Sequence, residues 1–225
     1  MRYSIILLVV FICSLNHPGN FCTEFLLSSV FADEEVFKPR EKKFGTEDEI
    51  SKQSTSHKPF TLINQDNEPV ALDSLIGKPL VMSFIYSRCS MPDMCPLIMK
   101  KIVQVQKGLK KEYKDKVFFA IITLDPEYDT PKVLREFGNY YRVDYDNLIF
   151  LTGKKDDVDY ALNHFRVYYK VESPGVLAHT METLVMDEAG VIRKDFPASF
   201  WKPEDVIEEI EKIIEKWEAS KDEND

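Results

Sequence analysis

Two almost wholly apolar runs constrain the fold of this chain most strongly. Residues 80–86 and 117–124 consist mainly of aliphatic, β-branched and aromatic side chains. Runs of this length without a polar face are typical of strands that are buried on both sides of a sheet. Because both faces of such strands must be covered, the runs predict a central sheet packed between helices.

Helical patterns follow the strand-like runs. Apolar residues recur at helical spacing from Pro96 to about Tyr113, and Asp129-Thr-Pro131 supplies a side-chain cap and a first-turn proline for a second helix. We expect further helices over 156–169 and from Pro203 onward. Residues 148–151 are expected to form a strand, and 59–72 and 183–193 to form hairpins. Strands that alternate with helices predict an α/β fold of three layers, with a mixed central sheet and an N-terminal β-hairpin.

The first 58 residues are expected to lie outside this fold. Residues 1–32 hold one positive charge, a short apolar run and the small residues Val30 and Ala32 at a cleavage-type site. They predict a signal peptide or an N-terminal anchor, and hence an exported, periplasmic or membrane-anchored protein. Residues 33–58 are polar and charged, as in a flexible linker. The domain is expected over 59–218, followed by a disordered acidic tail over 219–225.

The charge of the chain excludes one class of partner. The net charge is −9, and removal of residues 1–32 leaves it unchanged because Arg2 and Glu24 are lost together. An acidic surface does not suit nucleic acid, whose phosphates attract lysine and arginine. Beyond residue 32 no run is apolar enough to span a bilayer, so membrane contact is expected only through an uncleaved N-terminus.

Cys89 and Cys95 are the cysteines that remain after loss of the signal segment, and they lie at the junction of a strand and a helix. A helix N-terminus lowers the pKa of a nearby thiol, which favours a reactive or metal-binding thiolate. Two thiolates and one imidazole suit copper, because thiolate selects Cu(I) and imidazole supports Cu(II). His57 lies in the linker and His164 on a predicted helix. His179 precedes a predicted core strand, in a loop that can approach the cysteines.

Five segments in the same order carry a resemblance to a known family. They are 60–66, Gly77-Lys-Pro79, Pro92–Pro96, Thr123–Pro131 and 179–187. Together they make the chain, over about residues 60–217, resemble the SCO/SenC family of copper-binding, thioredoxin-like assembly factors. The resemblance implies a thioredoxin-like fold.

The resemblance also implies a role. In that family two cysteines and one histidine bind Cu(I) or Cu(II), here Cys89, Cys95 and His179. The implied function is a metallochaperone that takes copper from a donor protein and delivers it to the CuA-bearing subunit of cytochrome c oxidase. Five residues separate the cysteines here, where the family motif has three. Closing the longer loop changes the chain entropy only slightly, so the pair can still act together.

Two alternatives remain open from the sequence. The cysteines fit a thiol-disulfide oxidoreductase that acts on a partner protein, although they lack the Cys-x-x-Cys spacing and residues 178–182 contain no proline. They also fit a structural disulfide, but a loop this short stabilises a folded domain little. Among nearby methionines, Met99 is expected in the core, whereas Met91 and Met181 are candidates for outer thioether contacts.

Overall fold

The structure is a computed structural model that describes residues 61–222, so the predicted signal segment and linker, with His57, lie outside the described residues. The elements, in chain order, are β1 (Thr61–Asn64), β2 (Pro69–Ala71), the 3-10 helix η2 (Leu72–Leu75), β3 (Leu80–Ile85), α2 (Cys95–Gly108), α3 (Lys111–Lys114), β4 (Phe118–Thr123), α4 (Pro131–Tyr141), β5 (Leu148–Thr152), α5 (Lys155–His164), β6 (Tyr169–Ser173), β7 (Val176–His179), β8 (Glu182–Met186), β9 (Ile192–Pro197) and α6 (Pro203–Asp222).

Seven of the strands form one mixed sheet in the order β2-β1-β5-β4-β3-β8-β9. Strands β3, β4 and β5 are parallel, while β8 and β9 continue the sheet antiparallel at one edge and β1 and β2 at the other. The predicted parallel centre, antiparallel edge and N-terminal hairpin are confirmed. The remaining two strands, β6 and β7, pair only with each other.

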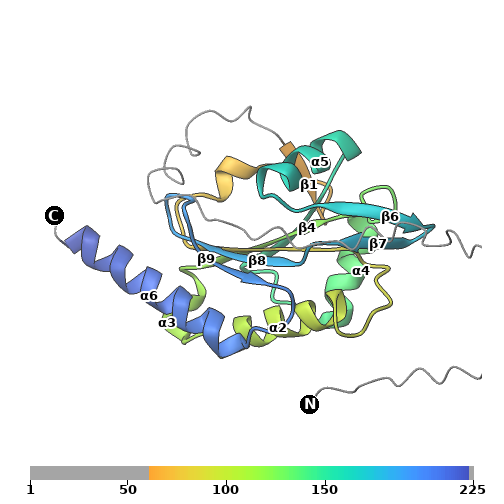
Figure 1. Cartoon of the computed structure of the whole chain (residues 1–225). Helices are drawn as coiled ribbons and strands as arrows, with labels where there is room; N and C mark the ends of the chain where they lie inside the picture. Colours follow the sequence, from red (N-terminus) through yellow and green to blue (C-terminus); the bar gives the residue numbers. More distant parts are fainter. Residues whose placement is uncertain (1–60, 223–225) are drawn as a thin grey trace, which may run out of the picture. The chain divides into compact units, whose positions relative to one another are not determined.

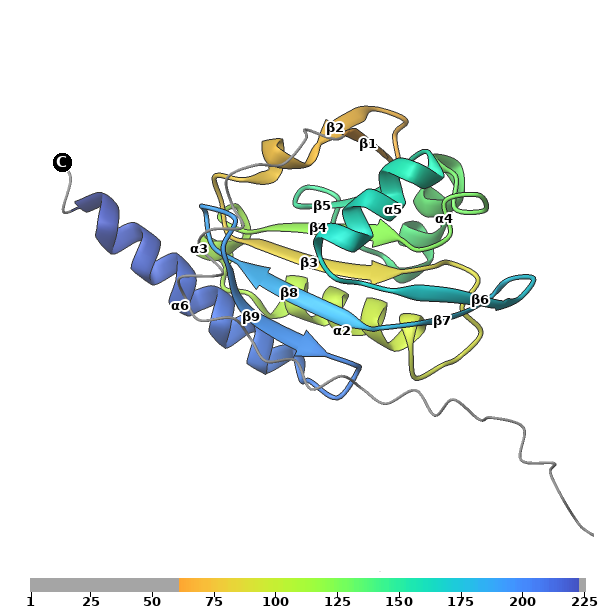
Figure 2. The same ribbon diagram turned by 45° about the horizontal axis from the view of Figure 1, so that its top comes forward.

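Helices cover both faces of the sheet (Figure 1). Helices α2, α4 and α6 lie on one face, while α5 lies on the other together with the β6–β7 hairpin. Figure 2 shows the hairpin extending past the ends of β3 and β8, where it crosses the loop that follows β3 in this view. The three expected layers are therefore present, and the hairpin is an addition at one end of the sheet.

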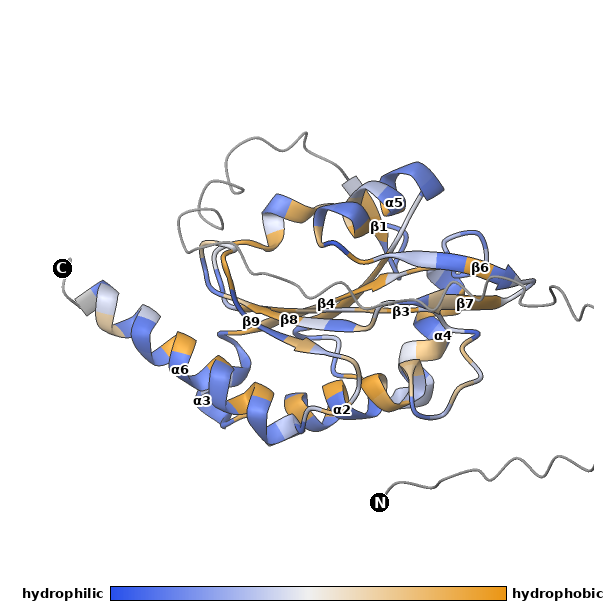
Figure 3. Ribbon diagram, in the orientation of Figure 1, coloured by the Kyte–Doolittle hydropathy of each residue, from blue (hydrophilic) through white to orange (hydrophobic). Residues whose placement is uncertain are grey.

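The core lies where the two apolar runs become strands. All six residues of β3 and all five of β8 are buried, as are five of the six in β4. Figure 3 shows the apolar colour concentrated in the central strands and on the inner sides of α2 and α6. The side chains of α6 that complete this layer are buried aliphatic residues, namely Val206, Ile210, Ile213 and Ile214.

The predicted helix from Pro96 to Tyr113 is shorter than expected. Helix α2 ends at Gly108, Leu109 is extended with ψ 140°, and residues 111–114 form the separate helix α3. A Cβ atom on Gly108 would lie 2.6 Å from the Ile207 side chain. Helix α6 thus approaches α2 closely at this glycine, where the chain leaves the helix.

The predicted helix over 156–169 is also wrong in its second half. Helix α5 ends at His164, and Arg166 adopts a left-handed conformation with φ 56°. The chain then turns into β6, so the loop expected around His179 is a β-hairpin instead. At the other end of the domain, α6 continues to Asp222, into the tail that was expected to be disordered from 219.

Residues 61–222 include no helix that is both long and apolar enough to cross a bilayer.

Candidate metal centre

The two cysteines lie on either side of one loop. Cys89 follows β3, where its backbone N–H donates to the Tyr86 carbonyl at 3.3 Å, and Cys95 is the first residue of α2. The helix thus begins one residue before the predicted start at Pro96, and Met94 is its N-cap. Both thiols are free, and the two residues are only 7% and 0% exposed. The strand and the helix therefore hold a reduced pair inside the protein surface.

His179 reaches this pair from the β6–β7 hairpin. It is the last residue of β7, and its Nε2 lies 3.7 Å from the Cys95 Sγ. Its Nδ1 lies 3.0 Å from the Thr180 carbonyl oxygen, which can only accept a hydrogen bond. Nδ1 therefore carries the proton, and Nε2 presents a lone pair toward the cysteines. This is the tautomer that a metal-binding histidine needs.

The separation of these two donors fits a shared metal ion. Bonds of about 2.3 Å to sulfur and about 2.0 Å to nitrogen place donors 3.7 Å apart at about 120° around one ion. Thiolate and imidazole are the donors that suit copper. Within residues 61–222, no three Cys, His, Asp or Glu side chains already form a closed ligand set. Cys95 and His179 thus lie close together, but the three donors must adjust their positions before all of them can bind one ion.

The two thiols differ in their charge. Hydrogen bonding from the Cys95 thiol lowers the pKa of Cys89 to about 3, against the effect of burial, and hydrogen bonds from the backbone at Met91 and Cys95 lower it further. The same interaction with Cys89, together with burial, raises the pKa of Cys95. Cys89 is therefore the thiolate at neutral pH, while Cys95 keeps its proton until a metal or an oxidant displaces it.

Tyr86 borders the site and was not predicted. Its ring meets the His179 imidazole edge-on, with centroids 5.7 Å apart and planes at 85°. Its hydroxyl oxygen accepts a hydrogen bond from the Leu177 backbone N–H at 3.4 Å. Burial raises the pKa of Tyr86 to about 12, and its interaction with Cys89 contributes in the same direction. The residue is therefore a neutral phenol between the hairpin and the cysteine loop.

A second set of polar contacts fixes the cysteine loop. The Arg88 guanidinium donates twice to Asp125 Oδ2, at 2.9 and 2.6 Å, and stacks over the Tyr128 ring. Asp129 is fully buried, and it accepts hydrogen bonds from the Ser87 backbone N–H at 3.1 Å and from the Ser87 hydroxyl. These bonds join the loop after β3 to the loop after β4. The Thr123–Pro131 motif is thus a support for the site, which its position after a core strand could have indicated.

Four other candidates from the sequence, one histidine and three methionines, lie among the described residues. His164 is exposed on α5, and Met99 is fully buried as expected. Met91 is 51% exposed on the cysteine loop, and Met181 is half-buried. None of the hydrogen bonds, ring contacts or electrostatic effects described for Cys89, Cys95 and His179 involves a methionine side chain.

Comparison with known proteins places this geometry in a family. The SCO1/SenC family model matches residues 48–215. A Bacillus subtilis protein described as an SCO1 protein homolog is 32% identical over 156 residues, which cover 68% of this chain and 79% of that protein.

Comparison with solved structures leads to the same family. The copper-bound structure of Bradyrhizobium japonicum ScoI has a TM-score of 0.60 and 28% identity, and the match covers 69% of this chain and 98% of that one. A structure that identified a disulfide switch in BsSco, described as a member of the Sco family of cytochrome c oxidase assembly proteins, has a TM-score of 0.59 and 30% identity. That match covers 69% of this chain and 91% of that one. The predicted thioredoxin-like fold and the family resemblance are thereby confirmed, and the chain belongs to the SCO1/SenC family.

Proposed function

We propose that this protein is a copper metallochaperone that holds one copper ion between Cys89, Cys95 and His179. The observation that carries the proposal is the approach of the His179 Nε2 lone pair to the Cys95 sulfur at 3.7 Å, from a hairpin that is distant in sequence. The donors are soft enough for Cu(I) and include the imidazole that favours Cu(II). The copper found in the B. japonicum relative supports the same cargo.

The chemistry of transfer follows from the unequal thiols. Cys89 is already a thiolate, so it can bind Cu(I) before Cys95 loses its proton. Cys95 and His179 then complete a three-donor site. A three-coordinate Cu(I) leaves room for an incoming thiolate, so the ion can pass to a partner through shared coordination without being released into solvent.

We propose cytochrome c oxidase assembly as the setting. The recipient would be the CuA-bearing subunit, supplied through this protein by a copper donor. Support comes from the family membership and from the description of BsSco as an assembly protein of this oxidase. Export to the periplasm, either free or anchored, rests on the signal-like pattern of residues 1–32.

Copper titration of the reduced protein tests the proposal. We expect one Cu(I) per chain, with loss of tight binding in Cys89→Ser and in Cys95→Ser. His179→Ala is expected to weaken Cu(II) far more than Cu(I), because the thiolates alone satisfy Cu(I). His164→Ala is the matched control, since that imidazole is exposed on α5, and it should bind both ions normally. Absence of stoichiometric copper uptake in the unsubstituted protein would refute the chaperone function.

A thiol-disulfide oxidoreductase remains the second candidate, because the cysteines are free and the pKa of Cys89 is strongly lowered. A low-pKa thiolate beside a second thiol is the arrangement that such enzymes use. An insulin-reduction assay separates the two functions. Thioredoxin-like turnover that requires both cysteines, without copper uptake, would favour the oxidoreductase.

A further inference from the structure

The His179 imidazole depends on a hairpin that lies outside the main sheet. Strands β6 and β7 pair only with each other, so the seven-stranded sheet does not fix their position. Tyr169 is the cross-strand partner of His179 in this hairpin. Any contact that holds Tyr169 to the rest of the domain therefore also constrains His179.

The register brings the two side chains close together. The Thr180 N–H donates to the Tyr168 carbonyl at 2.9 Å, so Tyr168 and Thr180 form a hydrogen-bonded pair. Antiparallel pairs alternate, which makes Tyr169 and His179 a non-hydrogen-bonded pair, the type in which opposing side chains lie nearest on one face. Leu177, two residues before His179 and on the same face, is buried, whereas its cross-strand partner Val171 is 60% exposed, so this face turns toward the protein along β7.

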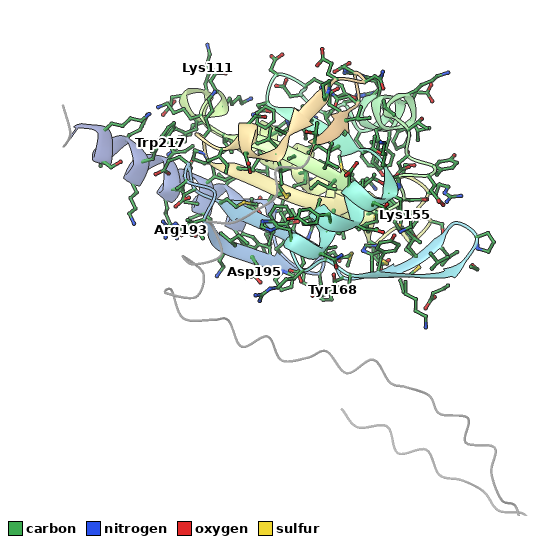
Figure 4. The ribbon with its side chains drawn as sticks, turned by 90° about the horizontal axis from the view of Figure 1, so that it is seen from above. Lys111, Lys155, Tyr168, Arg193, Asp195 and Trp217 are labelled. Carbon is green, nitrogen blue, oxygen red and sulfur yellow. The ribbon has the colours of Figure 1, made fainter. Side chains whose placement is uncertain are left out.

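Two charged residues of α5 hold the Tyr169 hydroxyl. It donates to Asp159 Oδ1 at 2.8 Å and accepts from Lys155 Nζ at 2.5 Å. Lys155 Nζ also pairs with Asp159 Oδ2 at 2.5 Å and lies 5.2 Å from the centroid of the Tyr169 ring. The three groups form a closed triangle in which each one contacts the other two. Figure 4 labels Lys155 on α5, and Tyr168 at the start of the hairpin beside it.

We propose that Tyr169 is a positioning residue for the copper site, anchored by Asp159 and Lys155, that holds the His179 imidazole toward Cys95. The inference rests on the proposed copper function and names a residue that supports the histidine without touching the metal. The anchor acts on the base of the hairpin, where β7 ends at His179. Helix α5 contacts β1 of the main sheet, so the anchor connects His179 to the body of the domain.

The contacts of Tyr169 with Asp159 and Lys155 matter more for the binding of Cu(II) than for the binding of Cu(I). Cu(I) is satisfied by two thiolates, which lie in the loop after β3 and at the start of α2, outside the hairpin. Cu(II) requires the imidazole, so its affinity depends on how well His179 is held. Residues that orient a metal-binding histidine typically change metal affinity by about 10–100-fold when they are replaced.

Paired variants test the proposal. Tyr169→Phe keeps the ring and removes the hydroxyl, and we expect it to weaken Cu(II) binding about tenfold while Cu(I) binding is unchanged. Tyr168→Phe is the matched control, because it makes the same chemical change one residue away at a side chain that is 58% exposed. Asp159→Asn breaks the triangle from the side of α5 and is expected to reproduce the effect of Tyr169→Phe. Electron paramagnetic resonance of the Cu(II) forms should show weakened nitrogen coupling in both variants but not in the control.

The outcomes separate this proposal from the proposed function. If the unsubstituted protein takes up no copper, the chaperone function fails first. If it binds copper, and Tyr169→Phe and Asp159→Asn both bind Cu(II) with unchanged affinity and nitrogen coupling, the positioning role of Tyr169 is overturned. An equal loss of Cu(I) and Cu(II) affinity would also overturn it, because it would indicate a general structural defect. If Tyr169→Phe does not fold, Asp159→Asn alone decides.

Discussion

At the scale of single residues, the two sulfurs of the site have different roles although only one short loop separates them. Cys95 donates to Cys89, so burial and hydrogen bonding place the negative charge on Cys89. The sequence could predict a reactive pair from its position between a strand and a helix. It could not predict which thiol ionises, because that depends on the orientation and burial of the two side chains in the folded protein.

The lowered pKa of Cys89 predicts how the amount of its thiolate depends on pH. Because the folded pKa of Cys89 is lowered to about 3, its thiolate should persist as the pH falls from 8 to 5, where an ordinary cysteine, with a pKa of about 8.5, is protonated. Ultraviolet absorbance of the thiolate in the reduced, metal-free protein measures this. In Cys95→Ala the main stabilising donor is lost, so the transition should move to higher pH. Complete loss of the absorbance between pH 9 and 7 in the unsubstituted protein would contradict the assignment.

Asp129 supports the cysteine loop through buried hydrogen bonds that the sequence did not reveal. Asp129→Ala removes the acceptor for the Ser87 N–H and for the Ser87 and Thr123 hydroxyls. Since unsatisfied buried donors cost about 1–3 kcal/mol each, we expect the free energy of unfolding to fall by at least about 2 kcal/mol. Glu127→Ala, in the same loop but exposed, should change it little. Equal urea midpoints for the two variants would contradict this account.

At the scale of elements, the strands and most helices followed from local pattern, but the hairpin that carries His179 did not. Four of the five residues of β6 are exposed, so the strand lacks the alternation of buried and exposed side chains that identifies strands in a sequence. For the same reason, the helix expected over 156–169 extended as far as Tyr169, which is the first residue of β6. The Pro174-Gly175 pair was the available signal, because this dipeptide is typical of turns.

Gly175 tests how the tip of this hairpin is held. It adopts φ +79°, and an added Cβ would lie 3.3 Å from the Arg88 guanidinium. Gly175→Ala should therefore lower the free energy of unfolding by about 1–2 kcal/mol through backbone strain, and also weaken Cu(II) binding by displacing the hairpin. Gly77→Ala is a control for strain alone, since φ is +114° there and no atom lies within 4 Å of the added Cβ. Unaltered Cu(II) affinity in Gly175→Ala would exclude a role for the tip.

At the scale of the whole molecule, the sheet brings distant segments to one end. Strands β3 and β4 are parallel, so the Cys89 loop and the Asp125 to Asp129 loop follow the same edge of the sheet. The sequence order of strands and helices predicted this arrangement, and with it a site at the ends of the strands. The hairpin lies at that edge because of tertiary packing, so its position could not be predicted from the local sequence pattern.

Because the three donors come together only in the folded chain, copper should stabilise the whole domain. At a free Cu(I) concentration one hundred times the dissociation constant, the free energy of unfolding should rise by up to about 2.7 kcal/mol, less any binding by unfolded cysteines. Thermal unfolding with and without Cu(I) measures the shift. The double variant Cys89→Ser, Cys95→Ser should show none, and an equal shift in that variant would place copper elsewhere on the protein.

X-ray absorption at the copper edge of the reduced protein, loaded with one equivalent of Cu(I), tests shared coordination most directly. We expect a first shell of two sulfur atoms and one nitrogen, with the nitrogen lost in His179→Ala. A shell of oxygen and nitrogen without sulfur, or a nitrogen that persists when His179 is replaced, would contradict this expectation.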